Sequence, residues 1–162
     1  MTDTLLATAT RAIAKRSFCT LATASDASRP HIAGVLYSAA GRTLYVSTFR
    51  DSRKARNVAV NPRVAVTVPV RRLPVGPPAA VQFQGTARIL DNDDPEIREL
   101  AAAGRLKAIS GHGELELDGG CVLRIEPGRR MVTFGLGMPL LRFLRDPLNA
   151  AGAVDLPVEP AA

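Results

Sequence analysis

The sequence predicts a mainly β protein in which short antiparallel strands build a closed or split β-barrel, with a few helices at its periphery. Several short stretches alternate apolar and polar side chains, as strands with one buried face do, and AAVQFQGTARIL (79–90) is the clearest of them. Turn-forming Gly, Pro, Asn and Asp residues separate these stretches. A length of 162 residues fits one domain, which we expect to span residues 1–147 ahead of a flexible tail at 148–162.

The N-terminal half combines one helix with a series of strands. Apolar residues recur at helical spacing between Leu5 and Ile13 and predict a helix over residues 4–15. Gly41 suits a tight hairpin turn, so the strands on either side of it are expected to pair antiparallel. The expected strands of this half are FCTLATAS (18–25), HIAGVLYSA (31–39), TLYVST (43–48) and RVAVTVPV (63–70).

A short helix is expected over residues 53–60. Ser52 is a suitable N-cap, and the Asn-Pro pair at 61–62 ends the helix because a residue before proline avoids the helical region. Arg53 and Lys54 follow the cap directly. Cations at a helix N-terminus oppose the helix dipole, whereas the free N–H groups there attract anions. This placement therefore predicts a binding site for a phosphate group.

The C-terminal half is expected to contain a loop, two helices and three strands. The Pro-rich RRLPVGPPAA (71–80) predicts an exposed hairpin loop before the strand that ends at residue 90. DNDDPEIRELAAAGRLKAI (91–109) predicts a helix, since Asp residues and a Pro mark its start. CVLRIEPG (121–128) and RRMVTFGLG (129–137) predict a second hairpin, followed by a short amphipathic helix at 139–146.

Charge and composition argue against several functions. The formal net charge is +6, but the basic residues lack the interleaved aromatic side chains and motifs of nucleic-acid-binding proteins. No uncharged apolar run approaches the roughly 18 residues of a membrane span, so we expect a cytoplasmic protein without a membrane partner. Cys19 and Cys121 lack a CxxC or His spacing, and His31 and His112 add no pattern of metal ligands. No GxGxxG motif follows a strand, and no Walker-type loop is present.

The segment around the basic helix start resembles that of a known family. LYVSTFRDSRKARNVAVNPRVAVTVPV (44–70) is similar to the FMN-binding segment of pyridoxamine 5'-phosphate oxidase-like split-barrel proteins, with SRKA and NPRV at the same spacing. A weaker resemblance extends over residues 17–137. The superfamily includes flavin/deazaflavin oxidoreductases, some of which use coenzyme F-420 and carry a KxRN version of the helix, which Lys54, Arg56 and Asn57 fit. The resemblance implies FMN as the cofactor, with coenzyme F-420 as the alternative.

The resemblance also implies which residues hold the cofactor. Arg53 and Lys54 look like the ligands of its phosphate, with Ser52 helping at the helix start. No catalytic side chain is implied, because the cofactor itself carries the hydride chemistry. The remaining implied contacts come from three strands: Ala33, Gly34 and Val35 beside the ring, Val46, Ser47 and Thr48 along the ribityl chain and ring, and Gln82, with Gln84 on the same strand face.

The chain departs from true pyridoxamine 5'-phosphate oxidases at two places. Those enzymes carry an Arg and a Lys in the second strand, where HIAGVLY offers neither, and a C-terminal Trp with an Arg-x-His signature, which RRMVTFGLGMP replaces. Oxidation of pyridoxamine phosphate is therefore not expected. Two classes of function stay open: an oxidoreductase acting on a small redox substrate, and a noncatalytic flavin or haem carrier on the same barrel.

A homodimer is expected, with the cofactor at the subunit interface. The family that the chain resembles pairs in this way, and VTFGLGMPLLRFL (132–144) adds apolar surface that must be buried. Leu141 and Leu144 are the residues of this segment that we expect in the interface. The alternative is that PLLRFLRD (139–146) packs on its own barrel.

Overall fold

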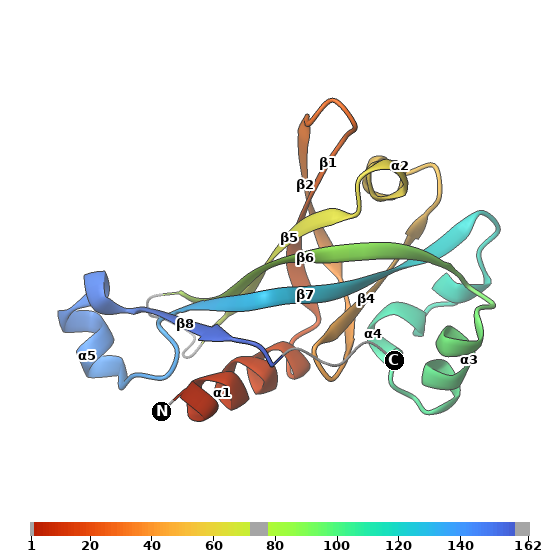
Figure 1. Ribbon diagram of the computed structural model, residues 1–162. Helices are drawn as coiled ribbons and strands as arrows, with labels where there is room; N and C mark the ends of the chain where they lie inside the picture. Colours follow the sequence, from red (N-terminus) through yellow and green to blue (C-terminus); the bar gives the residue numbers. More distant parts are fainter. Residues whose placement is uncertain (1, 72–77, 158–162) are drawn as a thin grey trace.

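The structure is a computed structural model that describes residues 2–71 and 78–157. An antiparallel sheet of eight strands curls into a half-barrel, which confirms the predicted mainly β split barrel (Figure 1). The strands are β1 (Phe18–Ala24), β2 (Pro30–Leu36), β3 (Ser38–Ala40), β4 (Thr43–Phe49), β5 (Arg63–Val70), β6 (Ala79–Asp91), β7 (Gly120–Phe134) and β8 (Ala151–Asp155). The helical segments are α1 (Thr2–Ala14), α2 (Arg53–Val60), α3 (Pro95–Ala102), α4 (Lys107–Ser110), η1 (Glu114–Glu116), α5 (Leu140–Arg145) and η2 (Pro147–Asn149).

The strand order is β2-β1-β5-β6-β7-β4-β3, so β2 and β3 stand at its two ends. Because only Tyr37 separates β2 from β3 in the chain, these two ends must lie close together, and the sheet curls round. The backbone N–H of Tyr37 donates to the carbonyl of Ser17 at 2.8 Å, and the chain bends there. The single strand predicted at 31–39 is therefore two strands. Within the described chain, β2 and β4 approach each other without forming a ladder, and this gap is the split of the barrel.

Two apolar clusters hold the fold together. The main core fills the barrel with inward side chains such as Leu21, Val46 and Phe83. The second cluster lies on the outer face of the sheet beneath α3 and α4, and its buried members are Tyr45, Leu90, Ile97, Leu106, Ile109 and Val122. Burial of apolar surface is the main driving force for folding, so the second cluster fixes the segment between β6 and β7 to the barrel wall.

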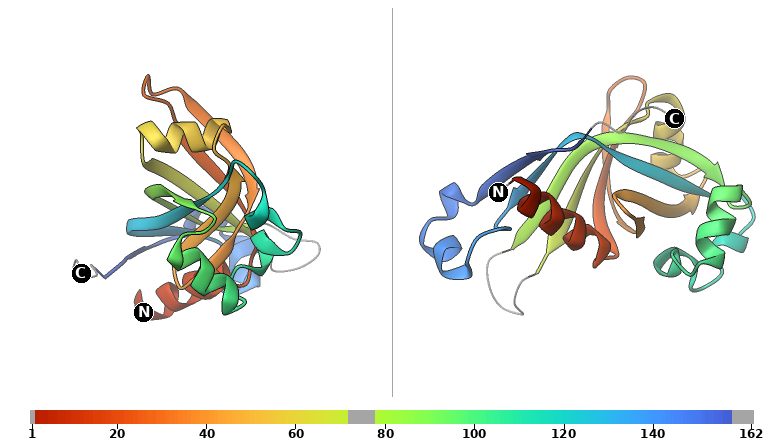
Figure 2. Two further views of the ribbon diagram at one scale, coloured as in Figure 1. Left: turned by 90° about the vertical axis from the view of Figure 1, so that its right-hand side faces the viewer. Right: turned by 60° about the horizontal axis from the view of Figure 1, so that its bottom comes forward.

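Helices α1 and α2 lie at opposite ends of the barrel (Figures 1 and 2). α2 packs on β1, β2 and β6, whereas α1 packs on β3, β6 and β8. The bounds of α2 agree with the prediction, since Ser52 is the N-cap and Asn61 the C-cap. Among the described residues, no helix combines the length and the apolar character that a membrane span requires.

The hairpin predicted within 121–137 is wrong, because these residues up to Phe134 form the single strand β7. β7 pairs with β6 along its length, with a register shift beside Gly85. A Cβ atom at Gly85 would overlap the carbonyl oxygen of Glu126, and one at Gly128 would lie 2.9 Å from the Gln84 carbonyl oxygen. The Pro-Gly pair therefore makes a bulge between closely approaching backbones instead of a turn.

The helix predicted over 91–109 is interrupted. α3 begins at Pro95 behind the N-cap Asp94, as predicted, but it ends at Ala102. Gly104 follows with a φ of +68°, the left-handed conformation that ends many helices, and α4 starts anew at Lys107.

The expectation of a flexible tail at 148–162 is wrong for its first part, which is folded. Residues 151–155 form β8, which pairs antiparallel with β7, and Val154 and Leu156 are buried. The small side chains of this strand give it little apolar alternation, which is why its pairing is hard to see in the sequence. Residues 158–162 lie outside the described chain, as does most of the loop predicted at 71–80, of which Ala79 and Ala80 belong to β6.

Candidate functional site

The basic start of α2 is tied to the end of β4 by two hydroxyl groups. The Thr48 hydroxyl donates to the Ser52 hydroxyl oxygen at 3.1 Å, and this oxygen accepts the backbone N–H of Ala55 at 3.3 Å. Ser52 stands directly before α2, three residues after the end of β4, and its side chain can therefore accept a free helical N–H group. The contact fixes where the next two residues, Arg53 and Lys54, leave the barrel.

A cavity of about 300 Å³ lies at the split of the barrel, where β2, β4 and the start of α2 meet the segment between β6 and β7. We call it the split pocket. Lys54 supplies a cation, and Ser47 and Thr48 supply hydroxyl groups. Most of the remaining lining is apolar. The full lining is Gly34, Val35, Leu36, Ser47, Thr48, Phe49, Lys54, Ala108, Ile109, Glu114 and Leu117.

The structure brings half of the predicted site residues together in this pocket, namely Gly34, Val35, Ser47, Thr48 and Lys54. Ser52 caps the adjoining helix. The other four lie elsewhere. Val46 is completely buried in the main core and Ala33 packs against that core, whereas Arg53 is exposed and outside the lining, and Gln82 lines a different groove.

Sequence reasoning missed the wall of the split pocket that comes from the segment between β6 and β7. Ala108, Ile109, Glu114 and Leu117 contribute to it. No local pattern marks these residues, because their approach to β4 depends on how α3 and α4 dock on the outer sheet face. Backbone hydrogen bonds from His112 and its own N–H lower the pKa of Glu114, so the wall carries an ionised carboxylate at neutral pH.

A polar network anchors this wall to the sheet. The Glu96 carboxylate of α3 accepts the Tyr45 hydroxyl at 2.6 Å, Arg124 Nε at 2.7 Å and Arg88 at 3.0 Å. Burial raises the pKa of Glu96, but the hydrogen bonds from Tyr45 and Arg124 outweigh it, and the pKa lies below its ordinary value. The pKa of Tyr45 is raised to about 12, by burial first and then by the hydrogen bond to Glu96. The network is therefore intact near neutral pH.

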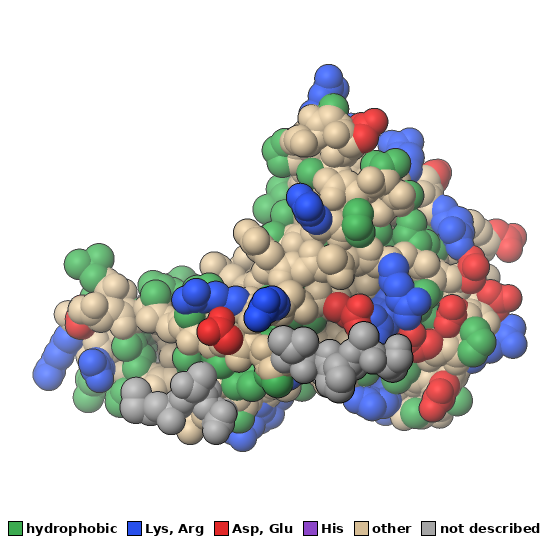
Figure 3. All heavy atoms as spheres, viewed as in Figure 1, with side chains coloured by type: hydrophobic (Ala, Val, Ile, Leu, Met, Phe, Trp, Pro, Cys, Tyr) green, Lys and Arg blue, Asp and Glu red, His purple; other side chains and the backbone are tan. Residues whose placement is uncertain are grey.

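Gln82 and Gln84 lie on the outer face of β6, in a groove of about 600 Å³ that also contains Thr67, Arg130 and Val132. We call it the outer groove. Uncharged polar side chains and backbone, tan in Figure 3, occupy the middle of the face shown there. Val132 is 38% exposed, so part of one apolar side chain of β7 faces solvent in this groove.

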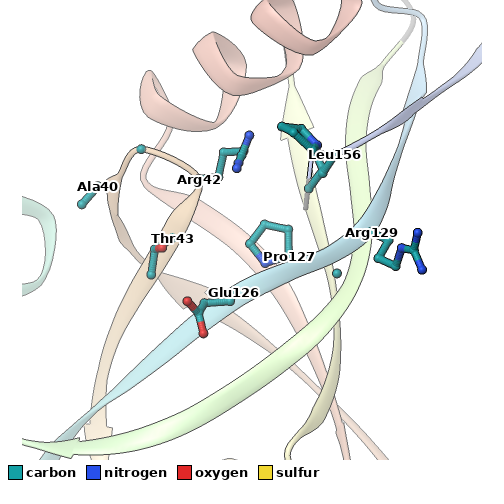
Figure 4. A pocket seen from close by; sticks show the side chains of 10 residues that line it. Ala40, Arg42, Thr43, Glu126, Pro127, Arg129 and Leu156 are labelled. Carbon is teal, nitrogen blue, oxygen red and sulfur yellow. The ribbon is translucent and has the colours of Figure 1, made fainter. Parts of the chain in front are cut away.

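A further cavity of about 470 Å³ lies at the turn between β3 and β4, next to the bulge of β7 (Figure 4). It is larger than the split pocket, but none of the predicted cofactor residues lines it. Its carboxylate, Glu126, forms an ion pair with Arg124. Because size alone does not recognise a ligand, the split pocket with its convergent Lys54 and hydroxyl groups is the better candidate site.

Comparison with protein families identifies the relationship that this geometry suggests. The profile of the family described as pyridoxamine 5'-phosphate oxidase matches residues 5–130, well over half of the chain. The chain belongs to the pyridoxamine 5'-phosphate oxidase family. The matched range contains the whole described lining of the split pocket and the outer groove except Val132. No protein of curated function matches the chain.

Solved structures share the fold of this family member. HutZ, the haem storage protein of Vibrio cholerae, is 19% identical, with 75% of this chain and 88% of its own covered and a TM-score of 0.64. A FAD-binding protein from Mesorhizobium loti is 20% identical, with coverages of 76% and 88% and a TM-score of 0.60. An F-420 reductase is 17% identical, with coverages of 73% and 92% and a TM-score of 0.52. At these identities the likeness concerns the fold.

Proposed function

We propose that the protein is an oxidoreductase that binds FMN, or alternatively coenzyme F-420, in the split pocket and acts on a small-molecule redox substrate. The observation that carries the proposal is the convergence of Lys54, Ser47 and Thr48 beside the exposed main chain of Gly34 in one cavity. Membership of the family and the flavin and deazaflavin proteins among the structural neighbours support it.

The residues present fit a ligand with one phosphate, a hydroxylated chain and an apolar ring. Lys54 would pair with the phosphate, and Ser47 and Thr48 would bond the hydroxylated chain. Leu36 and Phe49, which are more than 40% exposed, would cover ring surface and exclude water. When bound, the flavin or deazaflavin supplies hydride transfer, while the protein supplies position and a shaped cavity.

Parallel titrations of FMN, riboflavin and coenzyme F-420 test the proposal. Because a charge-assisted hydrogen bond contributes roughly 1.5–3 kcal/mol, FMN should bind about 10- to 150-fold more tightly than riboflavin, which lacks the phosphate. Tight binding of coenzyme F-420 with weak binding of both flavins would select the alternative cofactor. Equal affinities for FMN and riboflavin, without binding of coenzyme F-420, would contradict the phosphate site.

We further propose a homodimer in which the outer groove of one protomer completes the split pocket of the other. Gln82 lies outside the split pocket of its own chain, so it can serve a cofactor only from a second copy. Leu141 and Leu144 are 68% and 56% exposed on α5, whereas Leu140 is half-buried and Phe143 is buried, with its ring centroid 5.3 Å from that of Phe134. The alternative, that both leucines pack on their own barrel, has no support in these exposures.

A noncatalytic carrier is the second candidate. The named function of HutZ favours it, because that protein stores haem on the same fold. In the part of its lining that the structure describes, the split pocket has no His, Cys, Met or Tyr side chain, so the donors that usually hold haem iron are missing there. A flavin carrier therefore fits better than a haem carrier. Turnover of the reduced cofactor with an added electron acceptor distinguishes an enzyme from a carrier.

We expect no appreciable oxidation of pyridoxamine phosphate. The second strand lacks a cation at the split pocket, so a substrate phosphate would find no second anion site there. Arg129 and Arg130 line the outer groove. Robust release of peroxide from FMN-loaded protein with pyridoxamine phosphate would contradict this expectation and would direct attention to these two arginines.

A further inference from the structure

Helix α2 carries a buried polar contact that the site described above does not use. The Asn57 side-chain amide donates to the Thr23 hydroxyl of β1 at 2.9 Å. Asn57 is 7% exposed and Thr23 is 4% exposed, whereas the neighbouring Arg53 and Arg56 face solvent. A buried polar pair in an apolar interior costs stability unless its partners are well placed, so its position on this helix requires an explanation.

The pair lies on the side of α2 that carries Lys54. Residues three or four apart lie on one side of a helix, so Asn57 lies between Arg53 and Lys54 around the helix, and a rotation of α2 about the Asn57 contact would move Lys54. α2 has only eight residues, and a helix of this length is unstable alone in water. Its orientation must therefore come from contacts with the barrel. Ala55 and Val58 supply apolar contacts, which have little directional preference.

Two threonines supply the directional contacts. Thr23 is the second-last residue of β1, and Thr48 is the second-last residue of β4. Each threonine lies two residues after a buried core residue, Leu21 in β1 and Val46 in β4, and both reach α2 at the same end of the barrel. Thr48 holds the N-cap Ser52, and Thr23 holds Asn57 in the second helical turn. α2 is thus fixed at two points by hydroxyl groups from two strands.

We propose that Asn57 and Thr23 are positioning residues that set the rotation of α2 and thereby aim Lys54 into the split pocket. The inference rests on the proposed function, and it assigns Asn57 no contact with the ligand. Asn57 points at β1, away from solvent, and it is not among the residues that line the split pocket. The phosphate preference of the site depends on this bond even though neither partner touches phosphate.

The test compares wild-type protein with the Asn57→Leu/Thr23→Val double variant in titrations of FMN and riboflavin. Both substitutions roughly keep side-chain volume and remove both polar partners together, so no buried group is left unpaired. We expect the double variant to fold and to bind riboflavin as the wild type does. Its preference for FMN over riboflavin should fall by about tenfold or more, because Lys54 is no longer held in place.

A ligand-free measurement accompanies the titrations. Amide hydrogen exchange in α2 should become about tenfold faster or more in the double variant, with β5 and β6 unchanged. Thr23→Ser retains the accepting hydroxyl and should retain the preference for FMN. Tyr37→Phe is the matched control, since it removes another buried hydrogen bond, from the Tyr37 hydroxyl to the Ile13 carbonyl at 2.7 Å, and should leave the preference unchanged.

The outcomes separate the inference from the proposed function. A double variant that keeps the wild-type preference for FMN overturns the inference and leaves the proposed function in place. A Tyr37→Phe variant that loses the preference equally also overturns it, because any loss of buried polar contact would then suffice. Equal binding of FMN and riboflavin by the wild type overturns the proposed function together with the inference.

Discussion

The split pocket and the outer groove are both formed on the curled sheet, but they differ in how many elements build them. Three separate parts of the chain enclose the split pocket, and Lys54 enters it from a capped helix. β5, β6 and β7 with the adjoining bulge line the outer groove, whose polar side chains have no cover from another element. One chain therefore assembles the phosphate end of the predicted site, while Gln82 stays on a separate surface.

The strand order explains this separation. β6 is separated from β2 by β1 and β5, and from β4 by β7. Alternation along a strand tells which face a side chain occupies, but on a curled sheet two outward faces can point in different directions. Gln82 can therefore join the residues of the split pocket in one site only if two copies of the chain meet. Four experiments test the two surfaces.

The largest effect is expected from Lys54→Met. Loss of Lys54, the one lysine in the described lining of the split pocket, should weaken FMN binding by about 10- to 150-fold and leave riboflavin binding unchanged, because only FMN carries the phosphate. Fluorescence titration measures both affinities. Arg56→Met removes an exposed cation from the same helix and is the matched control. Equal losses in the two variants would show that general helix charge, and not Lys54, binds the ligand.

The combined change Leu141→Asp/Leu144→Asp tests whether α5 belongs to the interface. A charge buried between subunits is costly, so self-association should weaken by at least about tenfold, and FMN affinity should fall with it. Light scattering at several protein concentrations measures the assembly. Val60→Asp places a charge on another exposed apolar residue and should change neither property. Loss of folding in the double variant would favour packing of α5 on its own barrel.

Gln82→Ala should have a smaller effect. A neutral hydrogen bond contributes roughly 0.5–1.5 kcal/mol, so FMN affinity should fall by about 2- to 12-fold in the dimer. A mixed dimer of one Gln82→Ala subunit and one Lys54→Met subunit would combine both intact residues at one of its two sites. The number of high-affinity sites in such dimers should therefore be half that of the wild type. An unchanged affinity in Gln82→Ala would separate the outer groove from the cofactor site.

The smallest effect concerns the network that anchors the wall of the split pocket. Because the folded-state pKa of Glu96 is lowered, its contribution to stability is present above the ordinary value of 4.5 and is lost as the pH falls through the lowered pKa. Wild-type protein should therefore melt about 2–4 °C above Glu96→Gln at neutral pH, and this difference should shrink toward pH 3. A difference that does not change with pH would mean that the Glu96 charge contributes nothing.

Much of the fold follows from short-range patterns in the sequence. The bounds of α2 are encoded locally, since Ser52 can cap only the helix that follows it and Pro62 prevents its extension. β7 is the opposite case. Pro127 and Gly128 have the composition of a turn, but the chain continues as one bulged strand because Gly85 of β6 allows the two backbones to approach closely. That information lies on another strand and is invisible in the local pattern.

Some residues of the candidate site can also be predicted from local patterns, and others cannot. Ser47, Thr48 and Lys54 are close in the chain, so their convergence could be expected from one strand-to-helix joint. Ile109 and Glu114 reach the same pocket only through the docking of α3 and α4, which long-range apolar burial decides. The partner of Asn57 is equally difficult to predict, because Thr23 lies on β1, far from α2 in the sequence. The local signal for it is a threonine at an inward position of a strand.

The two parts of β7 on either side of the bulge pair with different strands. Before it, residues 120–125 pair with β4 inside the barrel, and after it, residues 130–134 pair with β8. β6 accompanies both halves. The barrel register is therefore settled before the chain reaches α5, η2 and β8. Insertions or deletions between β7 and β8 should consequently be tolerated by the barrel, so this part of the molecule can change in length during evolution while each protomer keeps its split pocket. Any effect of such changes on ligand binding would come from the pairing of subunits through α5.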